Sequence, residues 1–222
     1  RTIVCTAMDF PSMVYLYRGW QAAGFELKVV PSLEDLSVPA ERLAAAVDEH
    51  TAVVAFSHVL FRSSYIVDPR PVIERAHQVG AVVILDGYQS AGIVPVDVSA
   101  LGVDFFVGGC LKWLCGGPGN AFLYVRPDLR DTLEPKLTGW VAHQHPFDFA
   151  PPPMAYTDTA YRFNTGTPSV ACLYGAAEGL RIVGEVGVAT IRAHSLLLTD
   201  HLLAKADAAG LPSITPRDHA RR

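Results

Sequence analysis

Short apolar runs alternate with amphipathic segments along the first 125 residues of the chain. The apolar runs are rich in β-branched residues and have the length of buried strands; they cover residues 2–6, 26–30, 51–57, 81–86, 104–107 and 121–125. Helical patterns between them cover residues 12–23, 40–49 and 68–80. In the last of these, Gly80 ends a helix whose apolar face carries Val72, Ile73, Ala76 and Val79. This alternation predicts βαβ units, and therefore a three-layer α/β fold with a mostly parallel sheet and helices on both faces.

The pattern changes after Gly139. Residues 143–169 are rich in Pro, Tyr and Phe, which is typical of an extended excursion rather than of regular secondary structure. Two long helical patterns follow, over residues 169–183 and 187–209, and Gly210 ends the second. The residues after Leu211 are too few to form a domain.

The composition limits the classes of function. Half of the 222 residues are hydrophobic and the net charge is only −4, so we expect no nucleic-acid partner. No apolar run approaches the roughly 18 residues that a membrane-spanning helix needs, so no membrane partner is expected, and no signal-peptide pattern is present. The four cysteines form neither a CxxC pair nor a zinc-type spacing. We therefore expect reduced thiols, a cytoplasmic location and no bound metal.

Three polar residues stand where the carboxyl ends of the predicted strands meet. Ser57 and Asp86 end two strands, and Lys112 follows a third within a glycine-rich loop. In open parallel sheets, ligands bind at this edge. Taken alone, Ser57 could cap the next segment, Asp86 could begin a turn and Lys112 could extend into solvent. Together, a carboxylate and a lone lysine are what pyridoxal phosphate requires, because the amine forms a Schiff base with its aldehyde and the carboxylate keeps its pyridine nitrogen protonated.

The segment around these residues carries a family resemblance. Residues 85–125 read LDGYQSAGIVPVDVSALGVDFFVGGCLKWLCGGPGNAFLYV. This segment is similar to the cofactor-binding region of the class V aminotransferase group of fold type I pyridoxal phosphate enzymes, and most similar to kynureninase and kynureninase-like proteins. The resemblance implies that Lys112 binds the cofactor aldehyde and that Asp86 faces the pyridine nitrogen. It also implies a large cofactor-binding domain over residues 1–185 that lacks its N-terminal part. A helix over residues 186–222 would then lead into a small C-terminal domain that is absent here.

The resemblance implies five further contacts with the cofactor. Gln89 matches an amide that faces the phenolic oxygen of the ring in cysteine desulfurases, and Phe10 in DFPS matches a phenylalanine that packs on the ring. Ser57 matches a serine that lines the same pocket. Trp140 and Thr167 match positions that reach the phosphate of the neighbouring subunit, which implies a homodimer with shared active sites. For Phe10 and Trp140, ordinary core packing is the alternative interpretation.

Departures from the kynureninase pattern bear on the reaction. Kynureninases carry an aspartate where this chain has Met13 and a phosphate-binding tyrosine where it has Leu111. Together with Gln89, these departures favour an aminotransferase acting on a small-molecule α-amino acid. A kynureninase-type hydrolase that cleaves a Cβ–Cγ bond and a cysteine desulfurase-like lyase are the alternatives.

Two interpretations without this chemistry are less consistent with the sequence. A catalytically silent dimeric relative would have no need of Lys112 and Asp86, and the chain has both. A Rossmann-type nucleotide-binding protein is disfavoured because no GxGxxG motif follows the first predicted strand.

Overall fold

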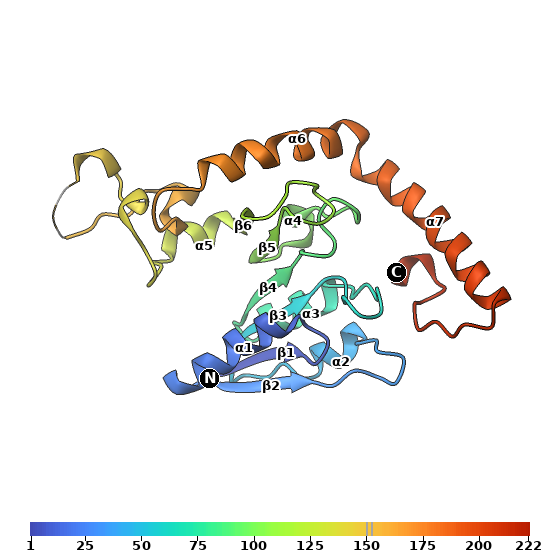
Figure 1. The fold of residues 1–222 in the computed structure, drawn as a ribbon. Coiled ribbons are helices and arrows are strands. Elements are labelled where there is room, and N and C mark those ends of the chain that lie inside the picture. Colours follow the sequence, from blue (N-terminus) through green and yellow to red (C-terminus); the bar gives the residue numbers. More distant parts are fainter. Residues whose placement is uncertain (150, 152) are drawn as a thin grey trace.

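The protein is built around a six-stranded sheet. The computed structural model describes residues 1–149, 151 and 153–222, and in it the strand order is β2-β1-β3-β4-β5-β6 (Figure 1). The strands are β1 (Thr2–Thr6), β2 (Glu26–Val30), β3 (Thr51–Ser57), β4 (Val82–Asp86), β5 (Phe105–Gly109) and β6 (Ala121–Val125). The first five are parallel, and β6 pairs antiparallel with β5. The predicted mostly parallel sheet is therefore confirmed.

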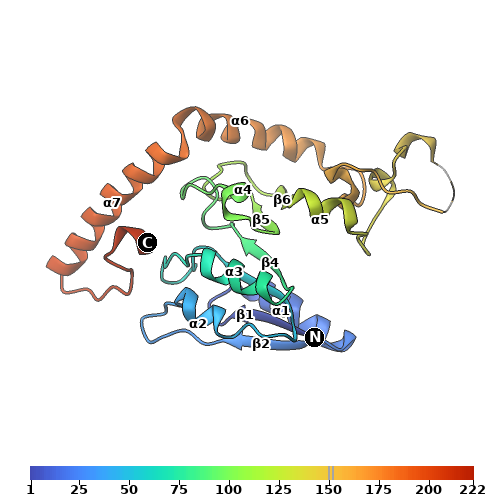
Figure 2. The same cartoon turned by 180° about the vertical axis from the view of Figure 1, so that it is seen from behind.

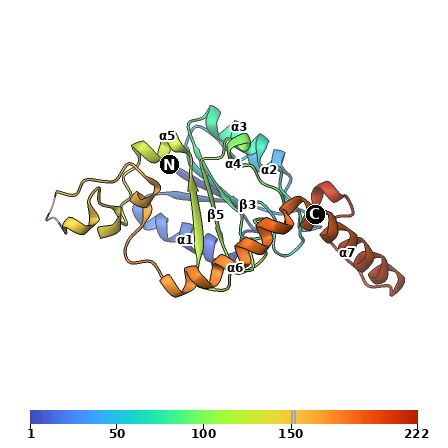
Figure 3. The same ribbon diagram turned by 90° about the horizontal axis from the view of Figure 1, so that it is seen from above.

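Helices cover both faces of this sheet, as predicted (Figure 3). One face carries α2 (Ala40–Ala44), α3 (Arg70–Gln78) and α4 (Val98–Leu101), and the other carries α1 (Pro11–Gly19) and α6 (Val170–Val186). The larger apolar cluster packs beneath α2 and α3 and includes Val54 and Val83. A smaller one packs beneath α1 and includes Cys5 and Tyr17. Two buried layers form because alternate residues of each strand point to opposite faces.

Some predicted boundaries are wrong. The helix predicted over residues 40–49 ends at Ala44. The N–H groups of Ala46 and Val47 donate to carbonyls three residues back, and the Asp48 N–H donates to the Thr51 hydroxyl instead of continuing a helix. The strand predicted over residues 104–107 instead covers Phe105–Gly109. Its ladder with β6 continues as far as the pair Gly109 and Ala121, on the two sides of the connecting loop. The sequence analysis missed α4 and α5 (Pro127–Thr132), each of six residues or fewer.

The two long C-terminal helices lie where the sequence predicts them. Figure 2 shows α6 passing along the β5–β6 side of the molecule and α7 (Val188–Ala208) continuing from it at an angle. Gly187, with a φ of 81°, separates them. Within the part of the chain that the structure describes, no single helix is long and apolar enough to cross a membrane. The pair α6 and α7 meets that requirement jointly, by length and composition only, with an 81° bend.

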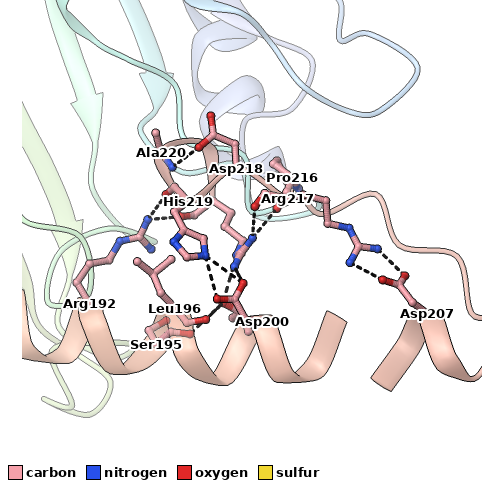
Figure 4. A network of polar contacts seen from close by, with 12 residues as sticks. Arg192, Ser195, Leu196, Asp200, Asp207, Pro216, Arg217, Asp218, His219 and Ala220 are labelled. Carbon is pink, nitrogen blue, oxygen red and sulfur yellow. Dashed lines mark hydrogen bonds and ion pairs between the residues drawn. The ribbon is translucent and has the colours of Figure 1, made fainter. Parts of the chain in front are cut away.

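The residues after α7 fold back onto this helix through a polar network (Figure 4). Asp200 on α7 accepts from His219 at 2.9 Å and also pairs with Arg222. Arg217 forms a two-pronged ion pair with Asp207, at 2.7 and 2.9 Å. Arg192, which lies on α7 before Asp200, donates to the His219 carbonyl at 2.8 Å. These contacts hold residues 217–222 against α7.

Gly179 lets α6 approach the loop that carries Lys112. A Cβ atom at this position would lie 2.1 Å from the Cys115 carbonyl oxygen, a backbone atom. We therefore predict that Gly179→Ala lowers the free energy of unfolding, measured by urea denaturation, by about 1–3 kcal/mol. Gly184→Ala on the same helix is the matched control, because no atom lies within 4 Å of its Cβ position; it should raise that free energy by about 0.5–1 kcal/mol. Equal effects of the two substitutions would contradict the close approach.

Candidate active site

Asp86 is a buried carboxylate at the carboxyl end of β4. Its Oδ1 accepts the Tyr88 N–H at 2.8 Å, and its Oδ2 accepts the Ser57 hydroxyl at 3.3 Å. The two strand ends meet because Ser57 and Asp86 are directly paired in the β3–β4 ladder. Burial raises the pKa of Asp86, while the hydrogen bonds from Tyr88 and Ser57 and the charge of Lys112 oppose this rise. Among the described residues, Asp86 forms no ion pair.

Lys112 lies in the loop of residues 110–120, between β5 and β6, and is half-buried. Its Nζ lies 4.8 Å from the centroid of the Tyr88 ring, a cation–π contact. The ring can take this place only because β5 ends in glycine. A Cβ atom at Gly109 would lie 2.4 Å from Cζ of Tyr88. The sequence Asp-Gly-Tyr after β4 and the glycines of β5 thus bring a carboxylate, an aromatic ring and an amine to one edge of the sheet.

This donor set suits pyridoxal phosphate. The buried Asp86 carboxylate has no ion-pair partner among the residues that the structure covers, and a protonated pyridine nitrogen would supply the missing positive charge. The half-buried amine of Lys112 belongs to the same cluster and can reach an aldehyde carbon. The residues present therefore fit the cofactor that the sequence predicts.

Phe10 and Gln89 lie at the same edge of the sheet. Phe10 caps the N-terminus of α1, remains 49% exposed and packs edge-to-face on Phe61 at 5.5 Å between ring centroids. This exposure argues against the core-packing alternative for Phe10. Gln89 is half-buried in the turn after β4. With Phe61 and Trp113 it lines a cavity of about 590 Å³ between this edge and α7.

The structure does not bring Trp140 and Thr167 to Asp86. Both belong to the segment that projects away from the sheet, drawn in yellow and light orange in Figure 1. Trp140 is 40% exposed and packs on the rings of Phe147 and Phe149 at 5.7 and 5.8 Å. Gly139, just before Trp140, lies against the backbone of Thr165, just before Thr167. A Cβ atom at Gly139 would lie 1.3 Å from the Thr165 carbonyl oxygen. The two residues therefore share a local unit separate from the Asp86 cluster.

Three residues of this region escaped the sequence analysis. Asp9, which precedes Phe10, is buried and accepts backbone N–H groups from Thr6 and Ser57. Tyr88 supports Lys112, and Phe61 supports Phe10. In the sequence, only their closeness to residues already assigned to the site could have indicated them.

His58 is a buried imidazole beside the site. Its backbone N–H donates to the Asp86 carbonyl at 2.9 Å, and its Nδ1 has no hydrogen-bond partner among the described residues. Burial lowers the pKa of His58 from 6.5 to about 4, although the charge of Asp68 opposes this shift.

Because the folded protein binds this proton less tightly than the unfolded chain, we predict that His58 makes stability fall as the pH drops from about 6.5 to about 4. The loss from this group should reach about 3 kcal/mol. Urea denaturation of wild type and His58→Leu at pH 7.5, 5.5 and 4.5 isolates the effect, because all other titrations are shared. Parallel pH profiles for the two proteins would contradict a buried neutral imidazole.

Comparison with known proteins identifies the family of the chain. The family model for Aminotransferase class-V matches residues 1–222. An uncharacterized aminotransferase of Bacillus subtilis, YcbU, is 37% identical over 193 residues, 86% of this chain and 50% of that protein. A kynureninase of Pseudomonas fluorescens is 34% identical over 230 residues, all of this chain and 53% of that protein. The chain thus spans about half the length of these relatives.

Solved structures share the fold. The cysteine desulfurase CsdA of Escherichia coli superposes with a TM-score of 0.80 at 22% identity, over 97% of this chain and 54% of that one. A cysteine desulfurase of Thermococcus onnurineus gives a TM-score of 0.80 at 23% identity, over 100% of this chain and 55% of that one. Since the family model covers the whole chain, this protein belongs to the aminotransferase class-V family, whose cofactor is pyridoxal phosphate.

Proposed function

We propose that this chain is the central part of a pyridoxal phosphate-dependent aminotransferase that acts on a small α-amino acid. The observation that carries the proposal is the buried Asp86 carboxylate, which lacks an ion-pair partner among the described residues, beside the half-buried Lys112. Family membership supports the cofactor. We infer the type of reaction and the substrate class from the residues around the site.

When bound, pyridoxal phosphate supplies an aldehyde that captures amines and a ring that accepts electrons. Lys112 would hold the aldehyde carbon through Nζ, and the same amine would serve as the base for the substrate α-proton. Asp86 would keep a proton at the pyridine nitrogen through its negative charge. Phe10 would pack on the ring and the Gln89 amide would donate to the phenolic oxygen, while Ser57 orients Asp86.

The aminotransferase assignment rests on what this chain lacks relative to kynureninases. Met13 packs in the apolar cluster beneath α1 with Tyr17, and Leu111 is an exposed hydrocarbon side chain in the Lys112 loop. Neither can donate to a phosphate or hold a water molecule. The relatives named aminotransferase and kynureninase support both branches, so hydrolysis of a Cβ–Cγ bond stays the alternative. A desulfurase-like lyase stays the third branch, on fold likeness alone.

We also propose that the protein acts as a homodimer with shared active sites. Trp140 and Thr167 sit in a projecting unit away from their own Asp86, a place from which they would contact a second copy. The adjoining helix α6 exposes apolar side chains along its length: Val170, Leu173, Tyr174, Leu180 and Ile182. Sedimentation analysis of the cofactor-loaded protein tests this, and a fully loaded monomer would contradict it. The cytoplasmic location expected from the cysteines stays a prediction.

Uptake of the cofactor is the first test of the proposed function. The natural full-length protein, incubated with pyridoxal phosphate, should gain visible absorption, and borohydride should then fix one cofactor per chain. Peptide mass spectrometry should place the modification on Lys112. A colourless protein, or reduction at another lysine, would overturn the proposal.

The reaction branch needs a second experiment. With excess α-amino acid and no acceptor, an aminotransferase releases one 2-oxo acid per site and then stops until a 2-oxo acid acceptor is added. A kynureninase-type hydrolase turns over without acceptor, releasing alanine and a carboxylic acid. A desulfurase does so when a thiol reductant is supplied, releasing alanine and sulfide. Continuous turnover without acceptor would therefore contradict the aminotransferase assignment.

A further inference from the structure

Asp9 is a second buried carboxylate close to the candidate site. It lies in the turn between β1 and α1 and is 4% exposed. Its Oδ2 accepts the Thr6 N–H at 2.7 Å, at the end of β1, and its Oδ1 accepts the Ser57 N–H at 2.6 Å, at the end of β3. One side chain thus clamps the carboxyl ends of two neighbouring parallel strands, where the sheet itself leaves backbone donors unpaired.

The second strand end is the one that contacts Asp86. Ser57 pairs with Asp86 in the β3–β4 ladder and donates its hydroxyl to Asp86 Oδ2 at 3.3 Å. The hydrogen bond that the Ser57 N–H donates to Asp9 fixes the backbone from which this hydroxyl extends. The Ser57 side chain also helps to lower the pKa of both carboxyls, so its hydroxyl lies near each of them.

A buried carboxylate such as Asp9 destabilises the folded state more than an uncharged side chain in the same structural role would. Within the described residues it forms no ion pair, and burial raises its pKa despite the hydrogen bonds from Thr6 and Ser57. The charge of Asp9 also acts on its neighbours. Burial raises the pKa of Cys5 to about 12 and also raises the pKa of Tyr17, and in both cases the charge of Asp9 adds to the rise. Asp86 acts on Tyr17 as well, so the two carboxylates share one buried region.

We propose that Asp9 is a positioning residue for the cofactor site: through the Ser57 backbone it sets the Ser57 hydroxyl against Asp86 and so fixes the direction in which the Asp86 carboxylate faces the pyridine nitrogen. This inference rests on the proposed function. It assigns to Asp9 no contact with cofactor or substrate. Asp9 acts on Asp86 through two hydrogen bonds: the Ser57 N–H donates to Asp9, and the Ser57 hydroxyl donates to Asp86.

Asp9→Asn keeps the size of the side chain and one acceptor, but turns an amide N–H₂ toward one of the two backbone donors. We expect pyridoxal phosphate to bind roughly tenfold more weakly, the effect of one charge-assisted hydrogen bond. The pH midpoint of the bound cofactor's absorption change should also shift, because the Asp86 carboxylate is no longer held in place. Both are read by titration of the full-length protein. Asp9→Ser provides a smaller uncharged variant if the asparagine variant does not fold.

Ser57→Ala tests the route of the effect, since it removes the hydroxyl and keeps the backbone N–H that Asp9 binds. If Asp9 acts through Ser57, adding Asp9→Asn to Ser57→Ala should change the midpoint and the affinity little further. The matched control is Asp97→Asn. Asp97 accepts two backbone N–H groups, from Ser99 and Ala100, at the start of α4, so its loss should affect folding stability alone.

The outcomes separate the two proposals. If wild type takes up no cofactor at Lys112, the proposed function fails and this inference with it. If wild type and Ser57→Ala respond as expected but Asp9→Asn changes only the unfolding free energy, as Asp97→Asn does, Asp9 is a structural clamp and the inference is overturned. Additive effects of Asp9→Asn and Ser57→Ala on the midpoint would overturn the route through Ser57.

Discussion

Replacing Lys112 with alanine should abolish the borohydride-dependent attachment of pyridoxal phosphate and lower turnover by about 10²–10⁴-fold or more. The methyl group can neither bind the aldehyde carbon nor accept the α-proton, and proton transfer by a positioned side chain alone accounts for that range. Cofactor affinity should fall less, because Asp86, Phe10 and Gln89 remain. The measurements are the mass of the reduced protein, the rate of 2-oxo acid release and the dissociation constant of the cofactor.

Two further variants separate chemistry from charge. Lys112→Arg keeps a cation over the Tyr88 ring, where Lys112 Nζ now lies 4.8 Å from the centroid, but cannot form the bond to the aldehyde. It should therefore be as inactive as the alanine variant. Lys205→Ala, on the exposed side of α7, should behave as wild type. Substantial turnover in Lys112→Arg, or borohydride fixation of the cofactor in Lys112→Ala, would show that another amine binds the aldehyde and accepts the α-proton.

The strands could be predicted from the sequence because each is a short, largely apolar run of strand length, including the more exposed edge strands β2 and β6. Residues 2–6, 26–30, 51–57 and 121–125 match the observed strands without a shift. Helix ends were harder, since they depend on local competition for backbone donors. The pattern over residues 40–49 predicts one continuous helix. In the structure, the helix ends at Ala44, turns with hydrogen bonds to carbonyls three residues back follow it, and the Thr51 hydroxyl accepts the Asp48 N–H. Such side chain–backbone bonds have no periodic signal.

The candidate site divides in the same way. Ser57 and Asp86 could be placed together in advance, because neighbouring parallel strands end at one edge of the sheet. The contact of Tyr88 with Lys112 could not, because it requires the ring to lie against Gly109, a close approach that no spacing in the sequence encodes. Asp9 escaped for a similar reason: its acceptor role joins two strand ends that are 51 residues apart at Thr6 and Ser57.

Asp86→Asn should be the second most damaging change at the site. The amide has nearly the same shape and still accepts the Tyr88 N–H, but it carries no charge to hold a proton at the pyridine nitrogen. We expect kcat to fall by about 10²–10³-fold, as when one preorganised electrostatic group is lost. The absorption of the bound cofactor should titrate at lower pH than in wild type, while Lys112 is still modified by borohydride.

The free energy of unfolding of cofactor-free Asp86→Asn distinguishes a loss of cofactor chemistry from a folding defect. Because burial raises the pKa of Asp86, its ionised form costs the folded protein stability as the pH rises above the ordinary carboxyl range. Asp86→Asn should therefore leave the free energy of unfolding at pH 7 unchanged or raise it.

Asp104→Asn is the matched control, at the opposite end of the adjacent strand. Asp104 is also buried, but it pairs with Arg126 at 2.8 Å and with His77 at 3.0 Å. Its substitution should lower the free energy of unfolding by about 1–3 kcal/mol, because the buried amide carries no charge and can no longer accept from Arg126, His77 and the Val83 N–H together, while the cofactor spectrum stays that of wild type. If Asp86→Asn instead loses stability as Asp104→Asn does and keeps the wild-type spectrum, Asp86 serves the fold rather than the pyridine nitrogen. Buried carboxylates are costly unless something of opposite charge faces them, and for Asp104 that partner is within the chain. For Asp86, the partner that the site implies is the cofactor.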